Sequence, residues 1–205
     1  MTRRLVLASA SPARLRLLRA AGLEPEVVIS GVDEDEVDGQ VHGAGPMALL
    51  LAERKAAAVA ALVGGDVLVL GCDSVLELDG EPHGKPASAE EASRRWRHMR
   101  GRTGTLLTGH CVIDNAGGMR ASDLAGTTVH FGHPTDDEID AYVATGEPLG
   151  VAGAFTLDGW SAPFIDGIEG DPGTVIGVSL PLVRRLLGDL GVAITELWRG
   201  GGASC

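Results

Sequence analysis

The sequence predicts an α/β fold built on a mixed, twisted β-sheet with flanking helices. In the first third of the chain, strand-like and helix-like segments alternate, which is typical of parallel strands connected by helices. Near the middle, two strand-like segments follow each other across a short turn, as in an antiparallel hairpin. The sequence contains no internal repeat and no obvious linker, so we predict one domain over residues 1–199 and a flexible glycine-rich tail at 200–205.

The alternation in the first third is carried by four segments. RRLVLAS (3–9) has the apolar character of a buried strand, and ARLRLLRAAG (13–22) repeats leucine at helical spacing before a glycine. EVVIS (26–30) predicts a second short strand. PMALLLAERKAAAVAALVG (46–64) predicts a long helix that begins at a proline and ends at glycines.

The central segments predict the core of the sheet. DVLVLGCDSVLELDG (66–80) is apolar on both faces over its first five residues, as expected of a central strand. GTLLTGHCVID (104–114) and MRASDLAGTTVHF (119–131) predict two strands, and the residues at 115–118 form the turn between them. The hairpin supplies the antiparallel part of the mixed sheet.

The remaining elements are predicted from capping signals and short apolar runs. Ser88 with Glu91, and Thr135 with Glu138, have the spacing of capping boxes at helix N-termini. We expect helices over 89–99, 136–146 and 179–191, and short strands at 154–157 and 162–165.

Composition limits the classes of function. The 205 residues include 44% hydrophobic and 22% charged residues, which is typical of a soluble globular protein. A formal net charge of −11 disfavours polymeric nucleic acid as a partner, although a few cations in one cleft can still bind a small anion. Three scattered cysteines favour a reducing compartment, and the absence of a signal sequence or a long apolar run predicts a cytoplasmic protein that binds no membrane.

Asp73 is the first candidate for chemistry. It appears at the C-terminal end of the most apolar strand-like segment, where a carboxylate is costly unless it is paired, hydrogen-bonded or bound to a metal. The carboxyl ends of strands are also where α/β sheets bind ligands. The alternative is that the strand has already reached solvent and Asp73 begins a turn.

The stretch LVLASASPARLRLL (5–18) predicts both a helix start and an anion site. Ser11 is a suitable N-cap and Pro12 a suitable first helical residue. Neither role explains Ser9, or Arg14 in the first helical turn, where the helix dipole disfavours a cation. An anion bound over this N-terminus would account for both residues, and a solvated arginine is the alternative.

Further charged residues are open to two interpretations. Lys55 interrupts an apolar helix and Lys85 lies in a Gly/Pro turn, and each is either a ligand or an ordinary solvated lysine. The turn is no Walker A loop, because its glycines are too close and Pro86 replaces the hydroxyl residue. The acidic run 33–36 is either a solvated loop or the source of a second carboxylate for a metal shared with Asp73.

Together these motifs resemble the Maf family of septum-formation-inhibitor-like proteins, regarded as nucleoside triphosphate pyrophosphatases. The resemblance extends in family order from about residue 4 to about residue 187. It is carried by LASASP with the following arginine, the acidic pair at 33–34, LAERKA, GCDSV, GKP, the TG of LLTGH, YVATGEPLGVAGAF and GTVIGVSLPLV.

The resemblance implies a mixed α/β fold with two lobes around a deep cleft, related in architecture to the inosine triphosphate pyrophosphatases. It implies cleavage of a nucleoside triphosphate between the α- and β-phosphates, to the monophosphate and pyrophosphate, with a divalent cation such as Mg²⁺ or Mn²⁺. It is compatible with a homodimer. The cellular role it implies is either house-cleaning of modified or excess nucleotides or control of septum formation.

The family's functional positions map onto this chain one by one. The catalytic carboxylate corresponds to Asp73 and the second acidic residue to Glu34, and both are the expected metal ligands. The phosphate-binding serine and arginine correspond to Ser9 and Arg14. The two family lysines correspond to Lys55 and Lys85. Whether Asp73 accepts a proton or binds the metal stays open.

Three positions that would contact the substrate depart from the pyrimidine-preferring branch of the family. That branch has Arg after the proline, Thr after the catalytic Asp and Gln before a later glycine, whereas this chain has Ala13, Ser74 and Asp158. The loss of a cation and the change from amide to carboxylate alter hydrogen bonding to a base edge. No base preference therefore follows from the resemblance.

Two other functions are compatible with the same residues. One is a regulator of cell division that binds a nucleotide without turnover, and the other is a domain that binds a different phosphorylated metabolite. The presence of both carboxylates and both lysines favours the enzyme, because a protein that only binds nucleotide could dispense with the carboxylates.

Overall fold

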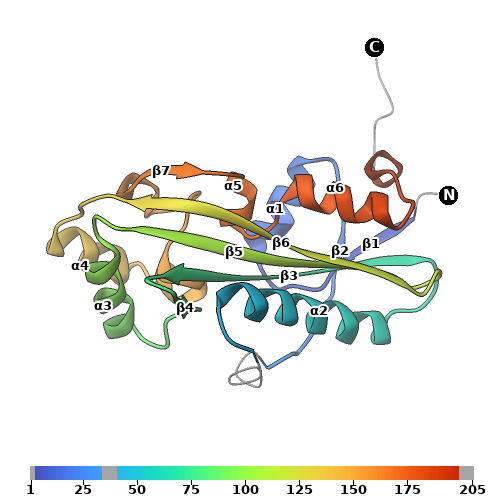
Figure 1. The fold of residues 1–205 in the computed structure, drawn as a ribbon, viewed down its shortest axis with the longest axis horizontal. Helices are drawn as coiled ribbons and strands as arrows, with labels where there is room; N and C mark the ends of the chain where they lie inside the picture. Colours follow the sequence, from blue (N-terminus) through green and yellow to red (C-terminus); the bar gives the residue numbers. More distant parts are fainter. Residues whose placement is uncertain (1–2, 34–40, 199–205) are drawn as a thin grey trace, which may run out of the picture.

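A computed structural model describes residues 3–33 and 41–198 of the chain (Figure 1). In these ranges seven strands form one sheet in the order β2-β1-β3-β5-β6-β7, with β4 paired to β3. The strands are β1 (Arg4–Leu7), β2 (Glu26–Val27), β3 (Val67–Leu78), β4 (Glu81–His83), β5 (Thr103–Asp114), β6 (Met119–Phe131) and β7 (Ile165–Glu169).

Helices flank the sheet on both faces. The α-helices are α1 (Pro12–Ala20), α2 (Ala44–Leu62), α3 (Ala89–Met99), α4 (Asp136–Ala144), α5 (Pro172–Ile176) and α6 (Leu180–Asp189). The 3₁₀ helices are η2 (Glu147–Gly150), η3 (Ala152–Ala154), η4 (Ala162–Phe164) and η5 (Ile194–Leu197). No helix of the described ranges is both long enough and apolar enough to cross a bilayer.

The sheet is mixed, as predicted. β1 runs parallel to β2 and β3, whereas β5, β6 and β7 continue the sheet in antiparallel order and β4 also pairs antiparallel to β3. The parallel part comes from the alternating strands and helices at the start of the chain, because parallel neighbours need a crossover connection. The antiparallel part begins at the predicted hairpin, whose turn connects Asp114 of β5 to Met119 of β6.

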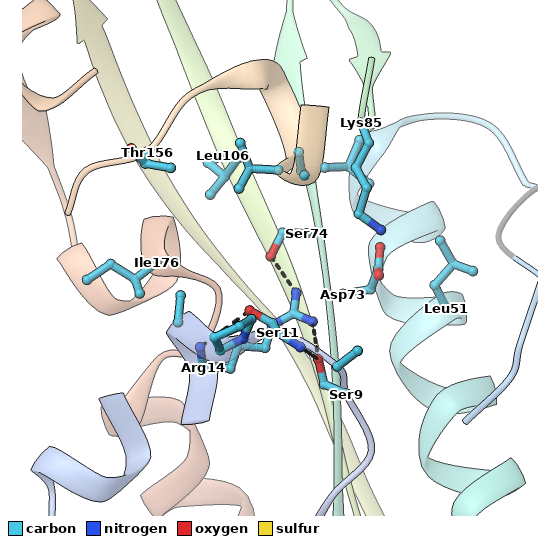
Figure 2. A pocket seen from close by; sticks show the side chains of 18 of the residues that line it. Ser9, Ser11, Arg14, Leu51, Asp73, Ser74, Lys85, Leu106, Thr156 and Ile176 are labelled. Carbon is cyan, nitrogen blue, oxygen red and sulfur yellow. Dashed lines mark hydrogen bonds between the residues drawn. The ribbon is translucent and has the colours of Figure 1, made fainter. Parts of the chain in front are cut away.

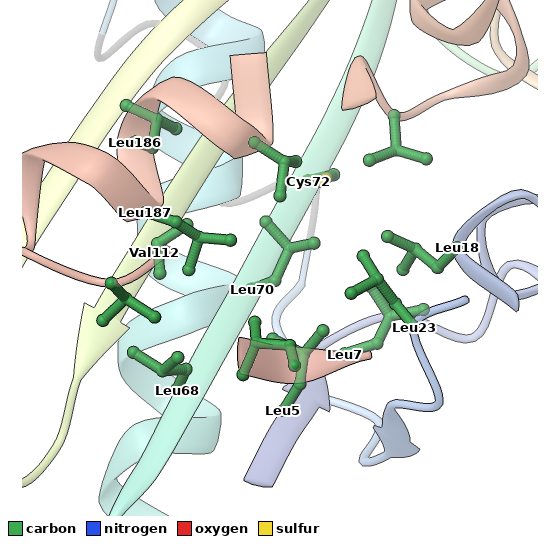
Figure 3. Close-up of a cluster of buried hydrophobic side chains, with 14 of the residues drawn as sticks. Leu5, Leu7, Leu18, Leu23, Leu68, Leu70, Cys72, Val112, Leu186 and Leu187 are labelled. Carbon is green, nitrogen blue, oxygen red and sulfur yellow. The ribbon is translucent and has the colours of Figure 1, made fainter. Parts of the chain in front are cut away.

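The alternation of side chains along β3 separates two cores. Leu68, Leu70 and Cys72 pack against α1 and α6 on one face (Figure 3). Val67 and Val69 pack against α2 on the other face. Successive side chains of a strand point to opposite faces, so a segment that is apolar throughout must be covered on both sides. The continuous apolar run in the sequence therefore indicated a central strand correctly.

A third core fills the far end of the sheet around Trp96. This side chain is fully buried, and its indole N–H donates to the carbonyl of Ala154 over 2.7 Å. Its ring makes edge-to-face contacts with Phe131, Tyr142 and Phe164 at centroid distances of 5.9, 5.5 and 5.8 Å. This cluster includes Leu76 and Leu78 of β3, on the same face as Leu70 and Cys72. Two apolar clusters thus occupy opposite ends of one face, with Ser74 between them.

Two glycines allow α2 to lie close against the sheet. A Cβ atom on Gly71 of β3 would lie 2.3 Å from the carbonyl oxygen of Ala52, and one on Gly109 of β5 would lie 2.4 Å from that of Ala48. Both separations are far below van der Waals contact, so only glycine fits at either position. This close contact sets the depth at which the side chains of α2 reach the functional site.

Several element boundaries differ from the sequence predictions. The strand expected at 26–30 is a two-residue strand, and the helix expected from residue 46 begins at Ala44. The strand predicted at 154–157 is wrong, because this segment begins in η3 and continues as irregular chain. The segment 162–165 is η4 followed by the first residue of β7. These two short apolar runs fill space in the hydrophobic core instead of extending the sheet, because Phe155 and Phe164 pack in the Trp96 cluster.

The predicted capping box is confirmed at α4, whereas at α3 only the bond to the Ser88 hydroxyl is present. Thr135 and Glu138 form the reciprocal capping box of α4. At α3 the hydroxyl of Ser88 accepts from the amide of Glu91, but the Glu91 carboxylate accepts from the amide of Ala87, one residue before the N-cap. The predicted tail at 200–205 lies outside the described residues.

Candidate functional site

A cleft of about 880 Å³ contains every candidate site residue of the described ranges. Its walls come from the segment between β1 and α1, from α2, from the middle of β3, from the turn after β4 and from the chain around η3. The candidate residues that line it are Ser9, Ala13, Arg14, Lys55, Asp73, Ser74, Lys85 and Asp158. Glu34 belongs to the segment 34–40 and lies outside the described residues.

The cleft lies at a gap along one edge of β3. On this edge β3 pairs with β1 as far as Leu70 and with β4 from Leu76 onward. Within the described ranges no strand flanks residues 71–75 on that side, while β5 pairs with them on the other. Because side chains on both faces of β3 can reach such a gap, Asp73 and Ser74 line the same cleft from opposite faces.

Asp73 occupies the middle of β3, and the prediction that it ends the strand is wrong. The strand continues to Leu78 because antiparallel pairing with β5 extends past the region that β1 covers. Asp73 nevertheless lies just beyond the end of the parallel pairing, where α/β sheets bind ligands. It is only 7% exposed, which excludes the alternative of a solvated turn residue.

Lys55 is the ion-pair partner of Asp73. Its Nζ lies 2.5 Å from Oδ1 of Asp73, and the lysine is itself 7% exposed. Lys55 belongs to the buried stripe of α2, in helical register with Ala48, Ala52 and Val59, so its side chain points to the sheet. A buried carboxylate and a buried ammonium satisfy each other, and the interpretation of Lys55 as a solvated lysine is excluded.

Arg14 turns away from solvent and is held at three points. Its Nε donates to the carbonyl of Gly177 over 2.8 Å. One Nη donates to Ser9 Oγ over 3.0 Å and the other to Ser74 Oγ over 3.1 Å (Figure 2). The residue is 9% exposed, so the alternative of a solvated arginine is excluded. An arginine has five N–H donors, and these contacts leave two for a ligand in the cleft.

The two serines before α1 have separate tasks. Ser11 is the N-cap, and its hydroxyl accepts from the amide of Arg14. Ser9 Oγ accepts from the amide of Ser11 over 3.2 Å as well as from the Arg14 guanidinium. Pro12 is the first helical residue, as predicted. The sequence S-x-S-P-x-R thus starts the helix and folds its arginine back over the preceding loop.

Lys85 extends into the cleft from the opposite side. Figure 2 shows its ammonium group pointing toward Asp73. The turn that carries Lys85 is held by the carbonyl of Gly84, which accepts from the amide of Gly153 over 3.0 Å and from Arg95 over 2.5 Å. These contacts connect the lysine to both η3 and α3.

One wall of the cleft carries the candidate base-contacting residues. Asp158 accepts from the Arg16 guanidinium over 3.1 Å, and both side chains line the cleft together with Ala13. Arg16 is 65% and Asp158 35% exposed at the side chain, so this pair spans the mouth rather than the floor. A small alanine beside it leaves this end of the cleft open.

The donor set suits a hard divalent cation that is held mainly by its substrate. No group of three or more His, Cys, Asp or Glu residues that could hold a metal occurs within residues 3–33 and 41–198. Asp73 is the buried carboxylate of the cleft, and Mg²⁺ commonly binds through one or two carboxylates plus substrate phosphates. Asp73 fits that pattern, with Glu34 as the predicted second ligand.

The neighbouring thiol is unsuited to nucleophilic chemistry. Cys72 points into the hydrophobic core, and burial raises its pKa to about 12. A thiol with such a pKa stays protonated at neutral pH and is a poor nucleophile.

Three residues that contact the site were not predicted from the sequence. Thr108 of β5 hydrogen-bonds Ser74, Gly177 accepts from Arg14, and Arg16 pairs with Asp158. Thr108 and Gly177 belong to two of the motifs that carry the resemblance, the TG of LLTGH and GTVIGVSLPLV, but the resemblance assigned them no role at the site. All three contacts join residues that are distant in sequence, so no local pattern indicates the contacts themselves.

Comparison with known proteins agrees with these motifs. A family model described as "Maf-like protein" matches residues 4–190. The chain is 68% identical over 198 residues to a protein of Streptomyces coelicolor named nucleoside triphosphate pyrophosphatase, covering 96% of this chain and 95% of that one. A protein of the same name from Salinispora tropica is 56% identical over 202 residues, covering 97% of this chain and 88% of that one.

A solved structure offers a weaker likeness. It is described as a nucleoside-triphosphatase or dITP/XTP pyrophosphatase from Mycobacterium abscessus, and it covers 94% of this chain and 98% of its own at 12% identity and a TM-score of 0.40. A score at this level carries no conclusion about architecture, so kinship with the inosine triphosphate pyrophosphatases stays a prediction. The match over residues 4–190 and the high identities establish the family directly: the chain belongs to the Maf family.

Proposed function

We propose that this protein is a nucleoside triphosphate pyrophosphatase, which hydrolyses a ribo- or deoxyribonucleoside triphosphate to the monophosphate and pyrophosphate. The observation that carries the proposal is that a buried carboxylate shares one cleft with several cations: Asp73 is paired with Lys55, and Arg14 and Lys85 line the same cleft. The names of the close relatives in Streptomyces coelicolor and Salinispora tropica support it. Modified nucleotides belong to the same substrate class.

The cations provide the phosphate-binding part of the site. A triphosphate that lies along the gap in β3 meets Arg14 from one side and Lys85 from the other, with Lys55 on the floor. Ser9 holds the guanidinium in position and lines the same cleft. Fixed positive groups stabilise charge that moves onto the phosphate oxygens as the bond to the leaving pyrophosphate breaks.

Asp73 serves the attacking water. The water oxygen forms the new bond to the α-phosphorus, the bridging oxygen leaves with the pyrophosphate, and the proton of the water passes to a base. The Asp73 carboxylate orients this water or accepts its proton, and Lys55 fixes the carboxylate through Oδ1. A divalent cation such as Mg²⁺ or Mn²⁺, held by Asp73 and Glu34, would screen the negative charge of the phosphates.

The base of the nucleotide occupies the mouth of the cleft in this proposal. Ala13 leaves room there, and Asp158 offers carboxylate oxygens that accept hydrogen bonds from a base edge. Asp158→Asn would replace one acceptor by a donor. We expect this variant to change the ratio of kcat/KM between bases and to leave pyrophosphate binding unaltered, whereas an equal loss for all bases would contradict the assignment.

The deciding experiment is a panel of canonical and modified nucleoside triphosphates, incubated with Mg²⁺ or Mn²⁺, with pyrophosphate and orthophosphate assayed separately. We expect pyrophosphate as the first product and its loss in Asp73→Asn. Asp114→Asn is the matched control, because Asp114 is also buried and paired, to Arg3 at 2.6 Å, but does not line the cleft. This variant should lose stability and retain turnover.

The same panel separates the alternatives. Tight nucleotide binding without turnover would favour the regulator of cell division, and orthophosphate as the first product would indicate a different phosphatase chemistry. Omitting the divalent cation tests metal dependence, which we expect to be complete.

Charge and composition support a proposal for the cellular location and the partners of the protein. We place it in the cytoplasm as a single domain over residues 1–199 that binds no membrane. The formal net charge of −11 disfavours polymeric nucleic acid as a partner. A homodimer is compatible with the family, and light scattering of the purified protein tests it.

A further inference from the structure

We propose that Thr108 is a positioning residue for Arg14 and acts through Ser74. The inference rests on the proposed function, in which Arg14 binds the phosphates. Thr108 lies on β5, directly opposite Ser74 of β3, and its side chain is fully buried. It does not line the cleft, so any effect on the substrate must pass through another residue.

Three hydrogen bonds connect Arg14 to the backbone of α5. The guanidinium donates to Ser74 Oγ over 3.1 Å, Ser74 Oγ lies 2.9 Å from Thr108 Oγ1, and Thr108 Oγ1 donates to the carbonyl of Thr174 over 2.8 Å. We call this series the hydroxyl relay. It runs from the cleft across one face of β3 and β5 to α5, which lies on the same side of the sheet as α1 and α6 (Figure 1).

The direction of the relay follows from its two ends. A carbonyl oxygen only accepts, so the single hydroxyl hydrogen of Thr108 is committed to Thr174. Thr108 Oγ1 must then accept a hydrogen bond from the Ser74 hydroxyl, which uses the single hydroxyl hydrogen of Ser74. The guanidinium at the other end only donates, and Ser74 Oγ accepts from it. Every donor and acceptor of the relay is used in a consistent direction.

The consequence concerns the role of Ser74. Its hydrogen is given to Thr108, so its hydroxyl has no donor left for a phosphate oxygen. Ser74 is therefore an acceptor that holds Arg14, while Arg14 makes the contact with phosphate. Without Thr108 the Ser74 hydroxyl would lose its acceptor and become free to rotate, and its oxygen would no longer stay directed at the guanidinium.

The second attachment of Arg14 leads to the same helix. Its Nε donates to the carbonyl of Gly177, the residue that caps α5, and Thr174 is the relay's end in that helix. Two carbonyls at the end of one short helix thus set the plane of the guanidinium, one directly and one through two hydroxyls. Binding groups that are fixed in advance gain affinity because less freedom is lost on binding.

Thr127 offers a matched control. It is fully buried on the neighbouring strand β6, and its hydroxyl donates to the carbonyl of Asp171 over 2.9 Å, at the other end of α5. Thr108 and Thr127 therefore make the same kind of bond to the same helix. Only Thr108 also contacts Ser74, so valine at each position separates the relay from general attachment of α5.

The test compares Thr108→Val, Thr108→Ser and Thr127→Val in steady-state hydrolysis and in calorimetric binding of pyrophosphate. We expect Thr108→Val to lower kcat/KM and to weaken pyrophosphate binding, each roughly 3- to 10-fold, the range for one lost hydrogen bond. Thr108→Ser retains the hydroxyl and should restore both quantities. We expect Thr127→Val to lower the thermal midpoint of unfolding as much as Thr108→Val does. Unlike Thr108→Val, it should leave kcat/KM and the affinity for pyrophosphate unchanged.

A double-mutant cycle keeps the proposal testable if Thr108→Val folds poorly. Ser74→Ala breaks the relay next to Arg14, so Thr108→Val should cause no additional loss of pyrophosphate affinity in that background. Additive losses, or equal kcat/KM in Thr108→Val and Thr127→Val, would overturn the inference. Failure of the proposed function looks different, since the wild-type protein would then release no pyrophosphate from any nucleotide while pyrophosphate binding still reports on the relay.

Discussion

Lys55 Nζ lies 2.5 Å from Asp73 Oδ1, and each side chain is 9% exposed at the floor of the cleft. The pair joins α2 to the central strand β3. Burial removes both charges from water, and the attraction between them offsets the cost of that desolvation. This contact is at once part of the fold and part of the proposed active site.

Removing one partner of this pair is expected to destabilise the protein. Lys55→Met leaves the Asp73 carboxylate without its cation, and we expect the free energy of unfolding to fall by about 3 kcal/mol, the lower end for a broken buried pair because the cleft admits water. The double variant with Asp73→Asn removes both charges and should recover much of that loss. Urea denaturation measures both, and a double variant no more stable than Lys55→Met would contradict the prediction.

The packing of α2 against the sheet depends on Gly71 and Gly109. Alanine at Gly71 would place Cβ 2.3 Å from the Ala52 carbonyl oxygen and force the helix outward. We expect a loss of about 2–3 kcal/mol in the free energy of unfolding, together with reduced turnover because Lys55 moves with α2. Gly64→Ala is the control, because nothing lies within 4 Å of its added Cβ, and similar losses in both variants would contradict this account.

Gly177 is expected to couple stability to activity. Its φ is +115°, and an added Cβ would lie 2.9 Å from Nε of Arg14. Gly177→Ala should therefore lower kcat/KM by displacing the guanidinium, in addition to straining the backbone. Gly191→Ala has φ +74° and open space around its Cβ, so it introduces strain alone. Steady-state kinetics distinguishes them, and unchanged kcat/KM in Gly177→Ala would show that Arg14 tolerates the displacement.

His110 is expected to make stability depend on pH. Its Nε2 accepts from the amide of Ser179 over 2.8 Å, which leaves Nδ1–H to donate to the carbonyl of Thr108 over 3.0 Å. Burial lowers the pKa of His110 from 6.5 to about 4, so the folded protein holds the neutral ring. Between pH 6.5 and about pH 4, the His110 ring is protonated in the unfolded chain but stays neutral in the folded protein. The free energy of unfolding therefore falls as the pH drops through this range.

The size of the His110 effect is about 3 kcal/mol between pH 7 and pH 4. Urea denaturation at several pH values measures it. Carboxylates contribute to the same pH range, so His110→Gln serves as the reference, and its stability should depend less on pH by that amount. Parallel curves for the variant and the wild-type protein would disprove the assignment.

Much of the fold could be predicted because its signals are local. The apolar run of β3, the helical spacing in α1 and α6 and the turn between β5 and β6 each lie within a short stretch of chain. The short runs at 154–157 and 162–165 were wrongly predicted as strands, because a few consecutive apolar residues are equally compatible with a strand and with an irregular segment that packs in the core. Neighbouring elements decided between them, as Phe155 and Phe164 complete the cluster around Trp96.

The candidate site was predictable in its residue types but not in its geometry. Motif resemblance indicated Asp73, Arg14 and the two lysines, whereas the apolar pattern placed Asp73 at the end of a strand that in fact continues to Leu78. The missed residue Thr108 contacts Ser74 across 34 positions of sequence. Spacing along the chain cannot indicate such a contact, because it depends on the register between two strands.

The sequence by itself determined the α/β class, the order of the main elements and the chemical groups available to the site. Only the tertiary structure decided that β1 stops at Leu7 while β3 continues, which opens the edge of the sheet at Asp73. It also decided that Lys55 and Arg14 are buried rather than solvated. The physical reason is that secondary structure follows from local side-chain pattern, whereas burial and the pairing of charges depend on which distant segments pack together.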